Sequence, residues 1–404
     1  MKTKIIVNIL ISIILLSVAT SCATETDPHP EIGIMSENED VAIKDDLNVL
    51  VFTDRYGEKA WDKVIEAFVR EFPGIDVGFE YVSGSEEDMK ISETREGLWD
   101  FVFADSPELL LKFESNNCLS DISVWYSENM DGRIIDALKP ANIHAVSSVP
   151  LLIDAYGLWY NEYFFTRNDL KIPFYYNNLN QIIMLEEPVL PIFICDKMNL
   201  QTFASNSVLT AAYSQMGNDL FALNDEDKSS VFDNMDFTDI VFRVKDALSE
   251  DRLMISESDD TIHQWASGKA MFYPGSMWLA RRIQSIVYHS FELRFSPGVF
   301  LLDDQHPCIL IDSASAFIPA KSPNKETALK FMEFIYTNNS LVTFTEDTYV
   351  PVACKTDLEN SNVSTITQEF IKLLSDPDLE IISAKELVNE EISQKIYKMI
   401  FLVE

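Results

Sequence analysis

The strongest constraint on the fold is an alternation of buried strands with an amphipathic helix that begins near residue 47. Residues 49–52 form a continuous apolar run, as expected of a strand covered on both faces. The next segment places apolar side chains along one helical face, namely Trp61, Val64, Ile65 and Phe68. A Pro-Gly pair ends that helix, and apolar residues then alternate over 75–81. This order predicts a β-α-β unit with parallel strands.

A second strand and helix follow at once. Residues 100–104 read Asp-Phe-Val-Phe-Ala, which is typical of another buried strand. Ser106 and Pro107 then mark a helix start, with serine as the N-cap and proline at the first helical position. Strands alternating with helices predict an α/β fold, in which ligands bind at the carboxyl ends of strands. Residues 53–56 and 104–105 are therefore expected to border a binding site.

Weaker patterns predict the remaining elements. Residues 151–153 and 157–160 indicate either a pair of strands or one crossing segment. A further strand is expected at 189–195, and helices at 206–222, at 236–249, from Ser322 onward, at 364–375 and at 384–401.

Length and charge limit the class of protein. At roughly 100–200 residues per domain, the 404 residues favour two lobes, and a hydrophobic content of 47% is enough to build them. The formal net charge is -34, from 65 acidic against 31 basic residues. Such a chain repels nucleic acid at long range, so nucleic acid is not an expected partner.

The first 22 residues predict export. Lys2 and Lys4 precede an apolar run over 5–16 that is too short to span a bilayer, where about 20 residues are needed. Small residues then lead to Cys22, an arrangement that resembles the lipobox of bacterial lipoproteins. That resemblance implies cleavage before Cys22 and a lipid on its sulfur; an ordinary secretory leader is the alternative. Residues 23–46 are polar and acidic, which predicts an extended tether.

Four stretches of the body carry a family resemblance. They are the strand-helix-strand unit over 49–81, the segment Trp-Asp-Phe-Val-Phe-Ala-Asp-Ser at 99–106, the segment Pro-Leu-Leu-Ile-Asp-Ala-Tyr-Gly-Leu-Trp-Tyr-Asn at 150–161, and Gly-Lys-Ala-Met through Gly-Ser-Met-Trp at 268–278. In this order and spacing the chain resembles the family 1 extracellular solute-binding proteins of ABC importers, the group of the maltose-binding protein. The resemblance runs from residue 47 to about residue 352.

The resemblance implies the type II periplasmic-binding-protein fold. Each of two α/β lobes would have a mostly parallel sheet flanked by helices, and a hinge of several crossing segments would join them. One crossing is expected near 153–155 and another near 299–302. The implied first lobe is 47–152 plus 302–340, and the second is 153–301 plus 341–404.

The resemblance also implies the ligand site. Matching motif positions are Asp54, Arg55, Asp105, Asp154, Tyr156, Phe203, Gly275, Ser276 and Trp278. Trp278 would stack on a sugar face and the charged groups would bind hydroxyls. For several of these residues a purely structural role is the alternative. Asp54 and Arg55 would pair within a turn, Asp105 would precede a helix cap, Asp154 would bond hinge backbone, and Phe203 would belong to the core.

Signatures of catalysis, cofactors and metals are not found in the sequence. No Gly-x-x-x-x-Gly-Lys nucleotide loop and no Gly-x-Ser-x-Gly motif occurs, and the five histidines form no pair at ligand spacing. We therefore expect a protein that is not an enzyme and carries no cofactor or metal. Four cysteines are widely spaced, which favours buried thiols but leaves a long-range disulfide open: Cys118, Cys195, Cys308 and Cys354.

These observations predict a monomeric receptor in the cell envelope, outside the cytoplasm and lipid-anchored to a membrane. Its expected partners are a small solute, expected to be a saccharide, and ABC permease subunits. The Pro-Pro-Thr-Trp segment of the family is missing, and only Ile-Pro-Phe-Tyr at 172–175 stands in its region. A surface lipoprotein of the same fold that acts as a sensor or interaction protein is therefore one alternative. A secreted glycoside hydrolase with two acidic residues is another.

Overall fold

One sheet of ten strands runs through the part of the chain that the computed structural model describes. The described residues are 45–130, 132–169, 192–217, 220, 230–249, 252–257, 260–288, 290–297, 308–359, 361–384 and 390–401. The strands are β1 (Asp45–Phe52), β2 (Ile75–Val82), β3 (Phe101–Ala104), β4 (Val149–Asn161), β5 (Phe193–Asp196), β6 (Leu253–Ser256), β7 (Phe272–Ser276), β8 (Leu293–Pro297), β9 (Cys308–Phe317) and β10 (Glu380–Ser383).

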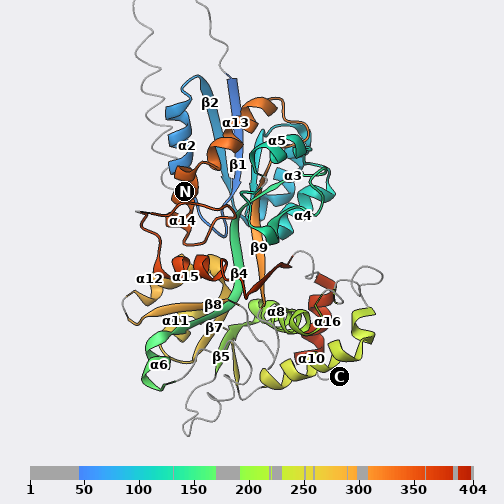
Figure 1. Ribbon diagram of the computed structural model, residues 1–404, viewed down its shortest axis with the longest axis vertical. Helices are drawn as coiled ribbons and strands as arrows, with labels where there is room; N and C mark the ends of the chain where they lie inside the picture. Colours follow the sequence, from blue (N-terminus) through green and yellow to red (C-terminus); the bar gives the residue numbers. More distant parts are fainter. Residues whose placement is uncertain are drawn as a thin grey trace, which may run out of the picture. The chain divides into compact units, whose positions relative to one another are not determined.

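Helices surround this sheet (Figure 1). Those before β5 are α2 (Lys59–Glu71), α3 (Glu87–Glu96), α4 (Pro107–Ser115), α5 (Ser123–Asn129) and α6 (Glu162–Arg167). Those after it are α8 (Lys197–Met216), α10 (Met235–Ala247), α11 (Thr261–Ala266), α12 (Ala280–Val287), α13 (Lys325–Ile335), α14 (Asn338–Thr348), α15 (Thr365–Leu373) and α16 (Glu390–Phe401). Short 3-10 turns lie at Gly84–Glu86, Asp136–Leu138, Ser230–Asp233 and Met277–Leu279.

The long strand β4 divides the sheet into two halves (Figure 1). Its first part, Val149 to Ala155, pairs antiparallel with β9, and its second part, Tyr156 to Asn161, lies between β7 and β8. Parallel pairs form the outer parts, β2-β1-β3 on one side and β7-β5-β6 on the other. Residues 151–153 and 157–160 therefore belong to one crossing strand rather than to a strand pair. The second predicted crossing, near 299–302, lies outside the described residues.

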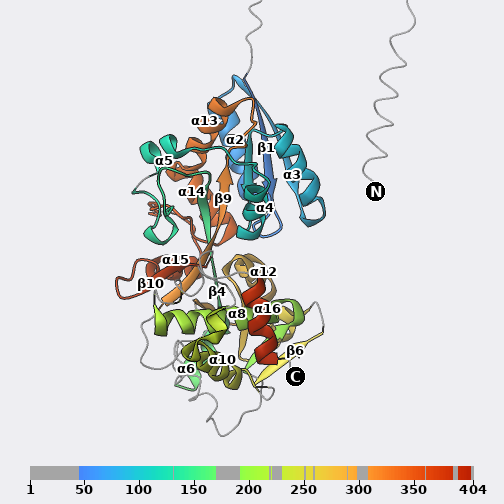
Figure 2. The ribbon, with the colours of Figure 1, turned by 90° about the vertical axis from the view of Figure 1, so that its right-hand side faces the viewer.

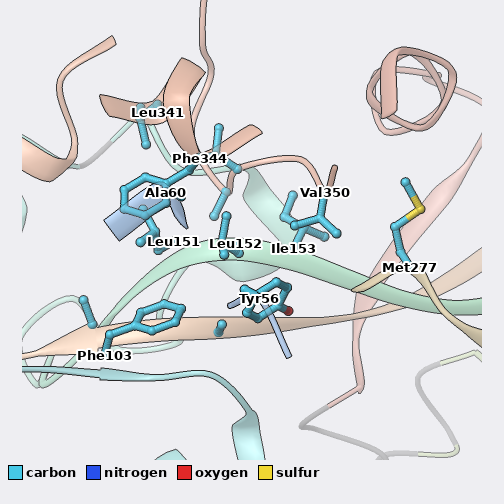
Figure 3. Packing of buried hydrophobic residues seen from close by; sticks show 14 of the residues in the cluster. Tyr56, Ala60, Phe103, Leu151, Leu152, Ile153, Met277, Leu341, Phe344 and Val350 are labelled. Carbon is cyan, nitrogen blue, oxygen red and sulfur yellow. The ribbon is translucent and has the colours of Figure 1, made fainter. Parts of the chain in front are cut away.

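The first half of the sheet contains the predicted β-α-β unit, with β1 and β2 parallel. The apolar face of α2 is buried as its spacing predicts, and Trp61 packs against Phe103 at 4.9 Å and Phe344 at 4.8 Å between ring centroids. Figure 3 shows this core around β4, with Tyr56, Phe103 and Phe344 among the labelled side chains. Burial of such rings contributes on the order of 1.5–3 kcal/mol each. Helix α4 also begins as predicted, because Ser106 Oγ accepts the Leu109 N–H at 3.1 Å.

Helix α8 anchors the second half and packs against α10 and α16 (Figure 2). It begins at Lys197, nine residues before the predicted start at 206, and Asp196 caps it by accepting the N–H of Asn199 at 2.8 Å. Between Phe203 and Tyr213 it is buried on nearly every side. A helix covered all round lacks the one-sided periodicity on which the prediction depended.

Two elements near the end of the chain, β10 and α14, were not predicted. Strand β10 pairs in parallel with β9. Helix α14 packs on α2, where Asp347 forms ion pairs with Lys59 and Lys63. The segment after α14 also stays with this half, because the Ala353 N–H donates to the Leu151 carbonyl at 2.8 Å.

Cys118, Cys195, Cys308 and Cys354 are all buried and free. Burial raises the pKa of the Cys308 thiol to about 12, with a smaller contribution from the nearby charge of Glu380. These cysteines are therefore small apolar side chains of the core, and the alternative of a disulfide among them is wrong.

Candidate functional site

The turn after β1 forms one wall of the site. Asp54 is exposed and accepts the Gly84 N–H at 2.7 Å, which holds the turn against the end of β2. Asp105 follows β3 and is buried, and its carboxylate accepts the Arg55 N–H at 3.1 Å. Burial raises the pKa of Asp105, and this hydrogen bond opposes the rise. The two aspartates therefore shape the turn that presents Arg55.

The Arg55 side chain reaches from this turn toward the crossing strand. Its guanidinium lies 3.0 Å from Glu108 of α4 and 4.0 Å from Asp154 of β4. Asp154 is buried, whereas the Arg55 side chain retains 24% exposure. Arg55 thus connects the carboxyl-end turns of the first half with the point at which β4 crosses.

Asp154 organises the other wall. Its Oδ1 accepts the backbone N–H of Trp278 at 3.1 Å, and the Ser276 hydroxyl also donates to this carboxylate. Burial raises the pKa of Asp154 to about 6, although the positive charge of Arg55 opposes the rise. Asp154 therefore binds the backbone of the turn at Trp278 and also lines a cavity. Its role in ligand binding stays a prediction.

Asp312 of β9 lies directly opposite Asp154 in the antiparallel pairing. Burial raises the pKa of Asp312 to about 7, and the negative charges of Glu108 and Asp154 raise it further. Asp312 and Glu108 were not predicted as site residues. For Asp312 a signal existed, because it is an acid within the otherwise apolar and small run of residues 308–317.

These groups line a cavity of about 210 Å³. Most of its described lining comes from the crossing strands, the turn after β1 and helix α8. The residues are Arg55, Glu108, Asp154, Ala155, Tyr156, Asn199, Thr202, Asn206, Ser276, Trp278, Leu310, Asp312 and Ala384. We name it the hinge cavity. Of the nine predicted site residues, it brings together Arg55, Asp154, Tyr156, Ser276 and Trp278.

A larger cavity of about 610 Å³ lies next to it, within the second half. Asn199 and Trp278 line both cavities, so these two residues stand at their boundary. The larger cavity falls in the range of 300–1,000 Å³ common for small-molecule sites. Its described lining also includes Tyr273, Lys197 and Arg282. We name it the outer cavity.

Four predicted residues lie elsewhere. Phe203 is fully buried in the core, with its ring 6.5 Å from that of Tyr156, and is not among the residues lining either cavity. Gly275 pairs with Gly157 between β7 and β4 and supports the turn that carries Trp278. Asp54 and Asp105 shape the neighbouring turn without lining either cavity. Cys22 lies outside the described residues.

The described residues contain no group of three or more His, Cys, Asp or Glu placed to hold a metal ion. The Tyr156 hydroxyl is buried and has no hydrogen-bond partner in the part of the chain that the structure covers. No helix within the described ranges combines the length and hydrophobicity needed to cross a membrane.

Neither a protein-family model nor a curated protein matches this sequence. Solved structures match its fold. MalE, the sugar-binding protein of Xanthomonas citri, is 13% identical, with a TM-score of 0.69 over 88% of this chain and 97% of that chain. The GacH receptor of Streptomyces glaucescens GLA.O, also solved with acarbose, is 15% identical, with a TM-score of 0.63 over 88% and 93%. Apo RafE from Streptococcus pneumoniae is 17% identical, with a TM-score of 0.64 over 89% and 94%.

The chain therefore has the two-lobed α/β fold of the sugar-binding receptors, which confirms the fold expected from the family resemblance. The similarity extends over the whole body of each neighbour. At sequence identities this low, the structural similarity establishes the architecture. The identity of the ligand depends on the residues that line the cavities.

Proposed function

We propose that this protein is an exported receptor that captures a saccharide and delivers it to the permease of an ABC importer, without chemistry on the ligand. The observation that carries the proposal is the hinge cavity, whose lining combines Trp278 with charged and amide residues from both halves of the structure. Sugar recognition needs an aromatic face against C–H groups and planar polar groups for hydroxyls. Asn199 and Asn206 of α8 add amides of this kind.

The structural neighbours support a carbohydrate ligand. Their names describe proteins that bind sugars or have been solved with them, including acarbose for GacH and raffinose for RafE. Residues from both halves line the hinge cavity, so closure of two lobes would bring them onto one ligand. Such closure is a population shift that depends on tighter binding to the closed form.

The lobes we propose follow the sequence expectation, 47–152 plus 302–340 and 153–301 plus 341–404, with one adjustment. Helix α14 and the segment to residue 354 pack with β4 and α2, which favours assigning them to the first lobe. We also propose lipidation at Cys22 and an acidic tether over 23–46. These features place the receptor at a membrane, outside the cytoplasm, where it can meet a permease.

The experiment is a thermal-shift and calorimetric screen of the leaderless protein against mono- and oligosaccharides, with polyamines and amino acids included. A ligand at 100 times its Kd should stabilise the protein by about 2.7 kcal/mol. Trp278→Ala should weaken binding at least tenfold. Trp125→Ala is the matched control, because Trp125 is also partly buried but lies on α5 and lines neither cavity.

Each outcome separates the candidate functions. Binding of one sugar class that is lost in Trp278→Ala and kept in Trp125→Ala supports the receptor. No binding across the panel would favour a sensor or interaction lipoprotein of the same fold. Recovery of oligosaccharides in cleaved form would establish a glycoside hydrolase instead. Uptake of the labelled sugar by cells that lack the gene tests delivery to the permease, and normal uptake would contradict it.

A further inference from the structure

The charges that line the hinge cavity do not balance. Among its described lining residues, Arg55 is the one cationic side chain, and it faces the acids Glu108, Asp154 and Asp312. Its guanidinium is already shared between Glu108 at 3.0 Å and Asp154 at 4.0 Å. Within the described chain, no ion pair joins Asp312 to a basic group. The cavity therefore holds an excess of negative charge beside β9.

Strand pairing forces two of these acids together. Asp154 and Asp312 are direct partners in the antiparallel pairing of β4 with β9, and both line the cavity. Directly opposed side chains in such a pair have Cβ atoms about 4.5–5.5 Å apart, and like charges in this position destabilise a sheet. A partly buried like-charge pair therefore costs stability unless one acid takes up a proton or a cation joins the pair.

The outer cavity does not share this imbalance. Among the residues that line it, Lys197 and Arg282 stand against Asp196 and Glu257, and Lys197 forms an ion pair with Glu257 at 2.9 Å. The excess of acidic residues is therefore confined to the hinge cavity, where β4 pairs with β9. Trp278 lies between this acidic end and the balanced outer cavity.

The acid pair of Asp154 and Asp312 suits an organic ammonium group better than a metal ion. Nowhere in the described chain do three or more His, Cys, Asp or Glu gather as metal ligands. An ammonium group has three N–H donors and bonds strongly to paired carboxylates. We propose that the saccharide carries a protonated amino group, which binds between Asp154 and Asp312 while its ring lies on Trp278. This inference rests on the proposed receptor function and names the class of sugar within it.

The binding should depend on pH in a characteristic way. The charged and titratable groups near the acid pair are Arg55 and Tyr56 from the turn after β1 and Glu108 from α4. Burial raises the pKa of Asp154 to about 6 and that of Asp312 to about 7. The affinity for an amino sugar should therefore rise from pH 5 toward neutrality and fall once the amine loses its proton. A neutral sugar has no such maximum.

The test compares sugars that differ at one substituent. Calorimetry on the leaderless protein uses glucosamine, galactosamine and mannosamine, each with its N-acetyl derivative and its parent hexose. The best amino sugar should bind at least tenfold more tightly than both of its relatives. Asp312→Asn should lower that affinity by about 10- to 100-fold, as expected for loss of a charge-assisted hydrogen bond. Glu66→Gln is the control, because it removes one exposed acid of α2 that lines neither cavity.

A measurement on the unaltered protein keeps the test independent of the variants. Rising salt should weaken binding of the amino sugar and leave a neutral sugar unaffected. Equal or tighter binding of the N-acetyl or neutral forms would overturn the amino-sugar inference and leave the receptor function standing. In the wider screen of saccharides, polyamines and amino acids, binding of polyamines alone, or of no compound, would overturn both the amino-sugar inference and the receptor function.

Discussion

The carboxylate of Asp154 accepts the backbone N–H of Trp278 at 3.1 Å, so the crossing strand β4 is tied to the turn that carries the indole. A second N–H, that of Ala155, donates to the same oxygen at 3.0 Å. The position of Trp278 in the site therefore depends on an acceptor at residue 154. Variants of Asp154 can therefore distinguish the contribution of its acceptor oxygen from the contribution of its negative charge.

Asp154→Ala should destabilise the protein, because the N–H of Trp278 loses its acceptor at a buried position. The expected loss is about 1–3 kcal/mol in the free energy of unfolding. Asp154→Asn keeps an oxygen acceptor and removes a buried negative charge, so it should be at least as stable as the unaltered protein. Urea unfolding at pH 7.5 measures both. Equal destabilisation by the two variants would contradict the assigned hydrogen bond.

The acid pair should make stability fall as pH rises. Burial raises the pKa values of Asp154 and Asp312 above the usual 3.8, to about 6 and about 7. Between pH 4 and 7 the folded state therefore binds more protons than the unfolded state, and unfolding becomes easier with rising pH. For Asp154 the change amounts to at most about 3 kcal/mol. A double variant with Asn at both positions should show a flatter dependence in urea unfolding from pH 4.5 to 7.5. Parallel curves for the two proteins would rule this coupling out.

Gly157 allows β4 and β8 to approach closely. A Cβ there would lie 2.3 Å from the Ser296 carbonyl oxygen and 2.7 Å from the Phe295 ring. Gly157→Ala should therefore lower the free energy of unfolding by about 2–3 kcal/mol, as overpacking does. Gly74→Ala is the control, because no atom lies within 4 Å of a Cβ built there. Thermal melting compares the stability of the two variants. A wild-type melting temperature for Gly157→Ala would show that β4 and β8 can move apart without loss of stability.

The parts of the fold predicted correctly are those whose signals are local. Helix α2 shows its buried face in its own spacing, and α4 shows its start at Ser106 and Pro107. The predicted start of α8 is nine residues too late. This helix is buried on nearly all sides, so its sequence lacks the polar face that marks an amphipathic helix. Strand β10 has four residues, and only its pairing with β9 identifies it as a strand.

The residues of the candidate site also fall into those that a local motif predicts and those that depend on the tertiary fold. Asp154 and Trp278 could be matched by motif, and the structure brings them together. Glu108 and Asp312 were missed, because their role depends on which strands and helices meet at the crossing of β4. Phe203 shows the opposite case, since an aromatic residue in a polar stretch can still belong to the core.

Phe203 should matter for stability and not for ligand affinity. Its side chain is fully buried and contacts the rings of Tyr156 and Phe193. Phe203→Ala should cost about 3–5 kcal/mol in unfolding free energy. Phe203→Leu should cost less than about 1.5 kcal/mol and leave the Kd for the sugar unchanged. A tenfold weaker Kd in a well-folded Phe203→Leu protein would instead place this ring in contact with the ligand.

Cys22 should determine whether the protein stays with the membrane. If its sulfur carries a diacylglycerol, two acyl chains anchor the protein stably, whereas a single chain would bind only marginally. Cys22→Ala should therefore move the protein from the membrane fraction to the soluble fraction and abolish incorporation of a labelled fatty acid. Cys118→Ala is the control, because Cys118 is a buried thiol of the folded body. Lack of label in the unaltered protein, together with unchanged fractionation of Cys22→Ala, would establish an ordinary secretory leader instead.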